Sequence, residues 1–104
     1  MIRVVKLTKR AEKKIENLLS FLELKWSQKV KSTFISKLEK SISQIQKHPD
    51  SFPESGMIKG LRKCVITRQT TKFYKYTEKE IFIITVFDNR QNPDSLYKES
   101  GNSI

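Results

Sequence analysis

Apolar residues in the first half of the chain recur at the spacing of amphipathic helices, after one short extended run. Residues 2–7, IRVVKL, are rich in β-branched side chains and favour a strand. Thr8 follows as a candidate N-cap, since its hydroxyl can accept a hydrogen bond from a backbone N–H of the first helical turn. The apolar residues beyond it keep the 3.6-residue period: Ala11, Ile15, Leu18, Leu19 and Leu22. The pattern therefore predicts a strand followed directly by a helix.

A second helix is predicted to begin where this period breaks, around residues 24–26. Ser27 is a candidate N-cap for it. One apolar stripe then follows: Val30, Phe34, Leu38, Ile42 and Ile45. The helix should end at His48, because Pro49 disfavours helical backbone at the residue before it. Two amphipathic helices with so short a link should form an antiparallel hairpin.

The second half of the chain reads as a loop and three strands. Residues 48–60, HPDSFPESGMIKG, contain two prolines and two glycines and indicate a loop. Strand-like runs follow at 61–68, 72–77 and 81–88, separated by links of three residues. Links of this length join antiparallel neighbours, so a meander is expected. The last run is apolar on both faces, which predicts a central strand of the sheet.

The order of these elements predicts an α+β fold in one domain. Neither helix can bury its apolar stripe alone, so the hairpin should pack on one face of the sheet. The other face of the sheet is then available as a working surface. We expect the domain to span residues 1–97, with a polar tail at 98–104.

The charge of the chain favours an anionic partner. Its 104 residues carry a formal net charge of +10. Residues 1–47 hold twelve basic and four acidic side chains, whereas residues 48–104 hold nine and seven. Most of the basic residues are lysines, which recognise phosphate less specifically than arginines do. A solubilising lysine-rich surface and an anion-binding surface therefore both remain open.

The residue inventory excludes several classes of site. Cys64 is the only cysteine and His48 the only histidine, so neither an internal disulfide nor a metal centre is expected. The three glycines form no phosphate-binding loop, and no cofactor is expected. The sequence also lacks an apolar stretch as long as a signal peptide or a membrane span. We therefore expect a cytoplasmic protein without membrane contact.

Arginines and tyrosines are the remaining candidates for chemistry. Arg62 and Arg68 share one face of their strand, but they lie roughly 20 Å apart along it and cannot bind one phosphate together. Three residues share a face of the next strand: Lys72, Tyr74 and Tyr76. Arg90 follows the central strand and can either reach the open face of the sheet or pair with Asp88. An edge salt bridge is the structural alternative for each arginine.

Three segments, together with the order of the elements, carry a resemblance to a known family. They are LRKCVIT at residues 61–67, FYKY at 73–76 and IFIITVFDNRQNP at 81–93. The chain resembles the RelE/ParE superfamily of toxins from bacterial type II toxin–antitoxin systems, which include plasmid-stabilisation systems. The resemblance covers roughly residues 2–97.

The resemblance implies one of two activities. RelE-like toxins cut mRNA in the ribosome, and the positions that match their basic and tyrosine residues are Lys63, Lys72, Arg90 and Tyr97. ParE-like toxins are associated with inhibition of DNA gyrase, and the segment FDNRQNP is closer to these. Val65 stands where a ribonuclease would carry a second basic residue of that strand. Gyrase inhibition is therefore our first hypothesis, and ribosome-dependent cleavage is the alternative.

If the toxin is a ribonuclease, the chemistry assigns each group a role. Arg90 and Lys72 would stabilise the charge that accumulates on the phosphate when the 2′-hydroxyl attacks it. Tyr97 would transfer the proton, although a phenol needs nearby cations to act as a base at neutral pH. A third hypothesis is a basic nucleic-acid-binding module that uses the lysine-rich helices, but the chain carries no base-reading motif.

The resemblance also implies a partner, a cognate antitoxin that forms a hetero-oligomer with the toxin. Since the chain has a charge of +10, the antitoxin segment should be acidic and amphipathic. Its apolar residues would cover the helix hairpin or the open sheet face. Exposed apolar candidates for this contact are Trp26, Phe52 and Met57, and the polar candidates are Arg62, Arg68 and Tyr74.

Overall fold

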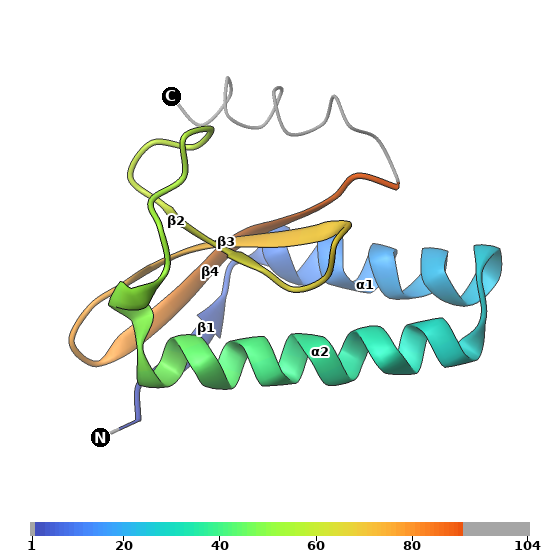
Figure 1. The fold of residues 1–104 in the computed structure, drawn as a ribbon, viewed down its shortest axis with the longest axis horizontal. Helices are drawn as coiled ribbons and strands as arrows, with labels where there is room; N and C mark the ends of the chain where they lie inside the picture. Colours follow the sequence, from blue (N-terminus) through green and yellow to red (C-terminus); the bar gives the residue numbers. More distant parts are fainter. Residues whose placement is uncertain (1, 91–104) are drawn as a thin grey trace.

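Two helices and one sheet form two layers in the computed structural model, which describes residues 2–90 (Figure 1). The elements in chain order are β1 (Val4–Leu7), α1 (Lys9–Lys25), α2 (Gln28–Lys47), the short 3-10 helix η1 (Pro49–Ser51), β2 (Arg62–Val65), β3 (Thr70–Tyr76) and β4 (Glu80–Asp88). The strand order in the sheet is β1-β4-β3-β2. Strands β2, β3 and β4 form the predicted antiparallel meander, whereas β1 pairs with β4 in parallel. The α+β prediction is confirmed, and β4 is a central strand.

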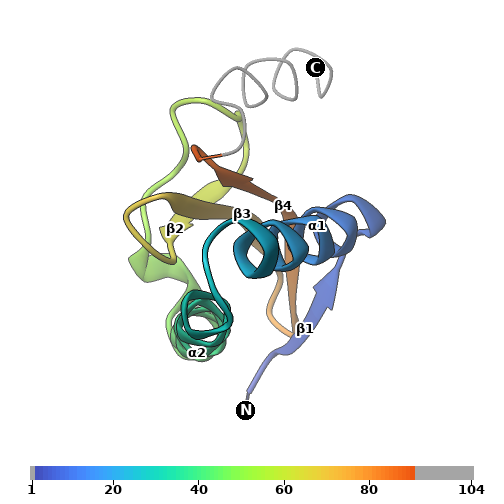
Figure 2. The same cartoon turned by 90° about the vertical axis from the view of Figure 1, so that its right-hand side faces the viewer.

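The two helices form an antiparallel hairpin that covers one face of the sheet (Figure 2). Both predicted N-caps are present. The Thr8 hydroxyl accepts a hydrogen bond from the Ala11 N–H at 3.0 Å, and the Ser27 hydroxyl accepts one from the Val30 N–H at 3.1 Å. Helix α2 ends at Lys47, directly before His48 and the proline. Local chemistry therefore sets where each helix begins and where α2 ends.

The core lies between the helices and the sheet. Its main cluster consists of Ala11, Ile45, Cys64, Tyr74, Ile81, Ile83 and Val86. A second cluster lies nearer the turn of the hairpin and consists of Leu18, Leu22, Phe34 and Ile66. The apolar stripes that predicted the helices supply most of the helical members of both clusters. Each stripe is buried against the sheet or against the other helix, which stabilises both layers.

A local irregularity in β4 ties the sheet to the start of α1. The register between β3 and β4 shifts at Ile84, which has no Cα partner in β3. Its carbonyl accepts a hydrogen bond from the Thr8 hydroxyl at 2.7 Å, and the Ile83 carbonyl accepts one from the Thr8 N–H at 3.1 Å. Thr8 thus caps α1 and also holds the bulged part of β4.

Replacing Thr8 by alanine should destabilise the fold by about 2 kcal/mol, since the change removes both the cap and the bond to the bulge. Ser27→Ala is the matched control, because the Ser27 hydroxyl caps only α2 and its loss should cost about 1 kcal/mol. Urea unfolding of both variants measures the difference. Equal losses in the two variants would show that the bond from Thr8 to Ile84 contributes nothing.

Two further findings concern membrane spans and metal sites. Within residues 2–90, no helix is long and apolar enough to cross a membrane. In the same part of the chain, no group of three or more histidine, cysteine, aspartate or glutamate side chains could hold a metal ion.

Candidate functional site at the end of the central strand

Arg90 is held in one orientation by Asp88, the last residue of β4. Its Nε lies 3.0 Å from Asp88 Oδ1, and its Nη2 lies 2.6 Å from Oδ2. The pair is not a surface salt bridge, because the side chains of Arg90 and Asp88 are only 15% and 1% exposed. The sequence left open whether Arg90 reaches the open face of the sheet or pairs with Asp88. In the structure, Arg90 pairs with Asp88.

The Asp88 carboxylate receives further hydrogen bonds. The Thr70 hydroxyl donates to Oδ2, and the backbone N–H of Arg90 donates to Oδ1 at 2.9 Å. Burial alone would raise the pKa of Asp88, but the hydrogen bonds from Arg90 and Thr70 outweigh it and hold the pKa below its ordinary value. The carboxylate is therefore ionised at neutral pH. It fixes a guanidinium group at the end of the sheet.

Trp26, at the end of α1, reaches the same place from the turn of the hairpin. The Arg90 Cζ atom lies 5.8 Å from the centroid of its ring, within the range of a cation–π contact. The indole is 57% exposed, so one face of this aromatic group stays accessible beside a fixed cation. Nothing in the sequence indicated a contact between Trp26 and Arg90, whereas the two side chains meet in the structure.

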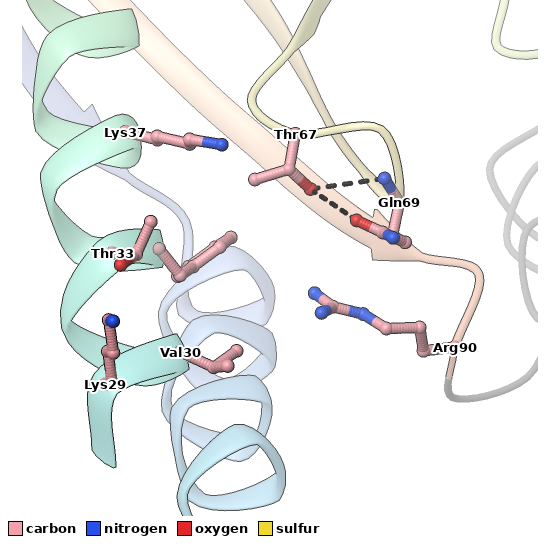
Figure 3. Close-up of a pocket in the computed structure, with 8 residues that line it drawn as sticks. Lys29, Val30, Thr33, Lys37, Thr67, Gln69 and Arg90 are labelled. Carbon is pink, nitrogen blue, oxygen red and sulfur yellow. Dashed lines mark hydrogen bonds between the residues drawn. The ribbon is translucent and has the colours of Figure 1, made fainter. Parts of the chain in front are cut away.

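An open cleft of about 240 Å³ lies between Arg90 and the first half of α2 (Figure 3). It is lined by Lys29, Val30, Thr33, Phe34, Lys37, Thr67, Gln69 and Arg90. Arg90 and Lys37 extend toward the cleft from opposite walls, and Thr67 and Gln69 are joined by hydrogen bonds on the sheet side. The cleft thus has cationic walls and an apolar floor.

The α2 residues of this cleft were missed by the sequence analysis, although the chain contained a signal. Lys29, Thr33 and Lys37 recur every four residues, which places them on one side of a helix. They adjoin Val30 and Phe34, two members of the apolar stripe. A polar row next to an apolar stripe is also typical of an ordinary amphipathic helix. What the sequence did not indicate is that Arg90 would face this row.

Lys72 lies inside the protein rather than on the open sheet face. The side chain is fully buried under α2, and its Nζ lies 2.5 Å from the Ser41 hydroxyl and 3.4 Å from the Cys64 thiol. Burial lowers its pKa, although the neighbouring Cys64 partly opposes this. A substrate on the open face would not reach this ammonium group in the observed conformation. Strand parity grouped Lys72 with Tyr74 correctly, but the shared face is the one that packs against the helices.

Tyr74 and Arg62 hold the loop after α2 in place. The Tyr74 hydroxyl, which is buried, donates a hydrogen bond to the Pro49 carbonyl at 2.6 Å, and burial raises its pKa. Arg62 Nη1 donates to the Phe52 carbonyl at 2.5 Å, and its Cζ lies 5.8 Å from the centroid of the Tyr76 ring. Both candidate binding residues thus have partners within the fold. Their contacts anchor residues 48–60 to the sheet.

The other candidates lie apart from one another. Lys63 and Val65 are exposed on β2, and Arg68 is exposed in the turn between β2 and β3. Tyr97 lies outside the described residues. Phe52, expected to be exposed, is half-buried and packs its ring edge-on against Tyr74 with centroids 6.4 Å apart, so that expectation was wrong. Two of the expected apolar residues, Trp26 and Met57, are exposed.

Known structures with the same fold come from toxin–antitoxin systems. The chromosomal ParDE system of P. aeruginosa superimposes with a TM-score of 0.70 at 12% identity, covering 84% of this chain and 96% of that chain. Toxin RelE of E. coli, as a double arginine-to-alanine mutant in the free state, superimposes with a TM-score of 0.61 at 17% identity, covering 100% of this chain and 99% of that chain. The E. coli DinJ–YafQ toxin–antitoxin complex gives a TM-score of 0.59 at 13% identity, covering 89% of this chain and 99% of that chain. At these identities the likeness shows a shared fold.

The family follows from a match at the level of sequence. No curated protein matches the chain. The model of the family described as "ParE toxin of type II toxin-antitoxin system, parDE" matches residues 5–93, which include every strand and helix described above except Val4, the first residue of β1. The chain is therefore a toxin of a type II toxin–antitoxin system and belongs to the ParE toxin family.

Proposed function

We propose that this toxin inhibits growth by binding DNA gyrase, without cutting RNA. The observation that carries the proposal is the position of Lys72, which a RelE-like ribonuclease would need beside the RNA phosphate. This lysine is buried beneath α2 and bonded to Ser41. Val65, at the second cationic position of such a set, presents an exposed apolar side chain. The match to the ParE family model agrees with this reading.

Purified toxin should inhibit the supercoiling of relaxed plasmid by gyrase at roughly equimolar ratios, as expected for a stoichiometric protein contact. Relaxation by a type I topoisomerase is the control, because nonspecific coating of DNA by a +10 protein would slow both enzymes. Full gyrase activity in a molar excess of toxin would contradict the proposal.

Ribosome-dependent mRNA cleavage is the second candidate, and one feature favours it. Lys63 is exposed on β2 and is free of a described ion pair, so it remains accessible to RNA. Mapping mRNA ends after induced expression distinguishes the two activities. Codon-positioned cuts in translated messages, together with undisturbed gyrase, would establish the ribonuclease and exclude our first choice.

The partner in the proposed system is an acidic antitoxin that binds the toxin in a hetero-oligomer. Two observations support it. The toxin carries a net charge of +10, and the similar DinJ–YafQ structure is a toxin–antitoxin complex. An acidic segment would be attracted over long range and would neutralise part of this charge on binding.

A further inference from the structure

A thiol and an amine are held against each other in the core beneath α2. Cys64 on β2 and Lys72 on β3 stand directly opposite each other in the antiparallel register, so they share one face of the sheet. The Lys72 Nζ atom lies 3.4 Å from the Cys64 Sγ atom and 2.5 Å from the Ser41 hydroxyl of α2. Both side chains are buried. The strand register and a bond from the covering helix therefore hold two reactive groups in contact.

We propose that Cys64 and Lys72 are a modification site, at which hydrogen peroxide drives the formation of a reversible sulfur–nitrogen bond between the two side chains. The bond would fasten the short edge strand β2 to β3. Neither residue lines the cleft at Arg90, and the proposal does not depend on which target the toxin binds.

The first step oxidises the sulfur atom of Cys64. The Lys72 amine takes the thiol proton, and the thiolate attacks one oxygen of the peroxide. The S–O bond forms as the O–O bond breaks, and the departing hydroxide takes the proton back from Lys72 and leaves as water. Sulfur loses two electrons to the peroxide, and Cys64 becomes a sulfenic acid beside a neutral amine.

The second step joins the two side chains. The nitrogen lone pair of Lys72 attacks the sulfur, so the S–N bond forms as the S–O bond breaks. The hydroxide leaves with a proton of the amine as a second water. One peroxide is consumed in total, and the protein loses two hydrogen atoms, one from sulfur and one from nitrogen.

The surroundings of Lys72 favour its amine as the group that captures the sulfur. Burial lowers the pKa of Lys72, which raises the share of the uncharged, nucleophilic amine. No carboxylate within residues 2–90 pairs with it. The Ser41 hydroxyl donates its own hydrogen to the Leu38 carbonyl at 2.8 Å, so it accepts a hydrogen bond from Lys72. The lone pair of the nitrogen is then left for the sulfur.

Burial also excludes the usual fates of an oxidised cysteine. Cys64 is the only cysteine, so no second thiol of the chain can reach its sulfur, and it is 1% exposed, which keeps bulky thiols out. Strand β2 is four residues long and lies at the edge of the sheet, where local opening admits a molecule as small as peroxide. A second peroxide must enter in the same way, whereas the amine is already in contact. Capture by Lys72 should therefore precede oxidation to the sulfinic acid.

Peptide mapping of the purified full chain after treatment with hydrogen peroxide tests the proposal. The intact mass should fall by two hydrogen atoms. After free thiols are blocked, trypsin should release residues 64–68 joined to residues 69–75, because it does not cut after a modified lysine. Dithiothreitol should restore the mass, since its thiol attacks the sulfur and the amine leaves with a proton. Oxygen gained on Cys64 while Lys72 is still cut by trypsin would overturn the proposal.

Two lysine variants identify the nitrogen that forms the bond. Lys72→Met keeps the thiol and removes the amine, so peroxide should add oxygen to Cys64 without any loss of two hydrogens. Lys63→Met is the matched control, because Lys63 is next to Cys64 in the chain but is exposed and points to the opposite face of β2. Its yield of cross-link should stay within about twofold of the wild type. A cross-link that persists in Lys72→Met, or disappears in Lys63→Met, would overturn the assignment.

The same treatment in concentrated urea shows whether the fold makes the bond. Cys64 and Lys72 are eight positions apart, so they meet only transiently in an unfolded chain. The yield of cross-link should then fall by at least about 10-fold, since the contact that orients amine and sulfur is lost. An equal yield in folded and unfolded protein would show that closeness in the sequence is sufficient, and the site in the structure would be overturned.

Discussion

Replacing Arg90 by alanine is expected to destabilise the protein by about 3 kcal/mol, because the Asp88 carboxylate would then be buried without its cation. For a chain of this size the melting temperature should fall by more than about 10 °C. Loss of an exposed surface ion pair would destabilise the protein by less than about 1 kcal/mol. The larger loss expected here depends on the burial of the Asp88 carboxylate. Thermal and urea unfolding measure the effect. Arg68→Ala, at an exposed arginine of the β2–β3 turn, is the control and should change little.

A second substitution separates the fold from the function. Asp88→Asn removes the buried charge, so the double variant with Arg90→Ala should recover at least half of the lost stability. Loss of growth inhibition in the folded double variant would assign Arg90 a functional role. Wild-type toxicity in that variant would show that the arginine acts only in the fold.

The pH dependence of stability provides an independent check on the same pair. The pKa of Asp88 is lower in the folded chain than its ordinary value of 3.8 in the unfolded chain. Its contribution is therefore fully present above that value and is lost as the pH falls through the lower folded-state pKa. Asp88→Asn should remove this part of the acid sensitivity. An unchanged acid profile in the variant would place the acid-sensitive group elsewhere.

The helix starts and the central strand could be predicted because their causes are local. Thr8 and Ser27 cap the helices through hydrogen bonds to residues only three positions away. Strand β4 was recognised as central because both of its faces are apolar, as a strand with neighbours and a covering layer requires. The parallel pairing of β1 with β4 was not predicted. Its register joins segments more than seventy residues apart.

Strand parity predicted which side chains share a face but not which face they share. Lys72 and Tyr74 are polar and were candidate site residues, yet both are buried beneath the helices. Their hydrogen-bond partners, Ser41 and the Pro49 carbonyl, lie 31 and 25 positions earlier in the chain. Buried polar groups need such partners, and partners this distant are not visible in a local pattern.

The candidate site was predicted only in its local part. Arg90 and Asp88 are two residues apart, and their pairing was one of the alternatives considered. The contact with Trp26 and the cleft beside Lys37 depend on how the hairpin turn lies against the end of β4. That arrangement follows from the packing of two layers. No spacing within either segment indicates it.

Replacing Lys72 by methionine should stabilise the protein by about 2 kcal/mol, because it removes a buried charge that no carboxylate within residues 2–90 pairs with. Methionine keeps a flexible stem of similar length and fills the same space. Ser41 stays satisfied in the variant, since its hydroxyl already donates to the Leu38 carbonyl at 2.8 Å. Lys75→Met, at an exposed position on the same strand, is the control and should change stability by less than about 0.5 kcal/mol.

The pH dependence and the toxicity of the Lys72→Met variant complete this prediction. Burial lowers the folded-state pKa of Lys72 below 10.5, so wild-type stability should rise as the pH increases from the folded value toward the unfolded one. The methionine variant should lack this rise. It should still inhibit growth if the toxin acts by contact with gyrase, because a side chain under α2 does not reach a protein partner. A variant that is more stable but harmless would instead require Lys72 to act on a substrate, and the ribonuclease would then be the better account.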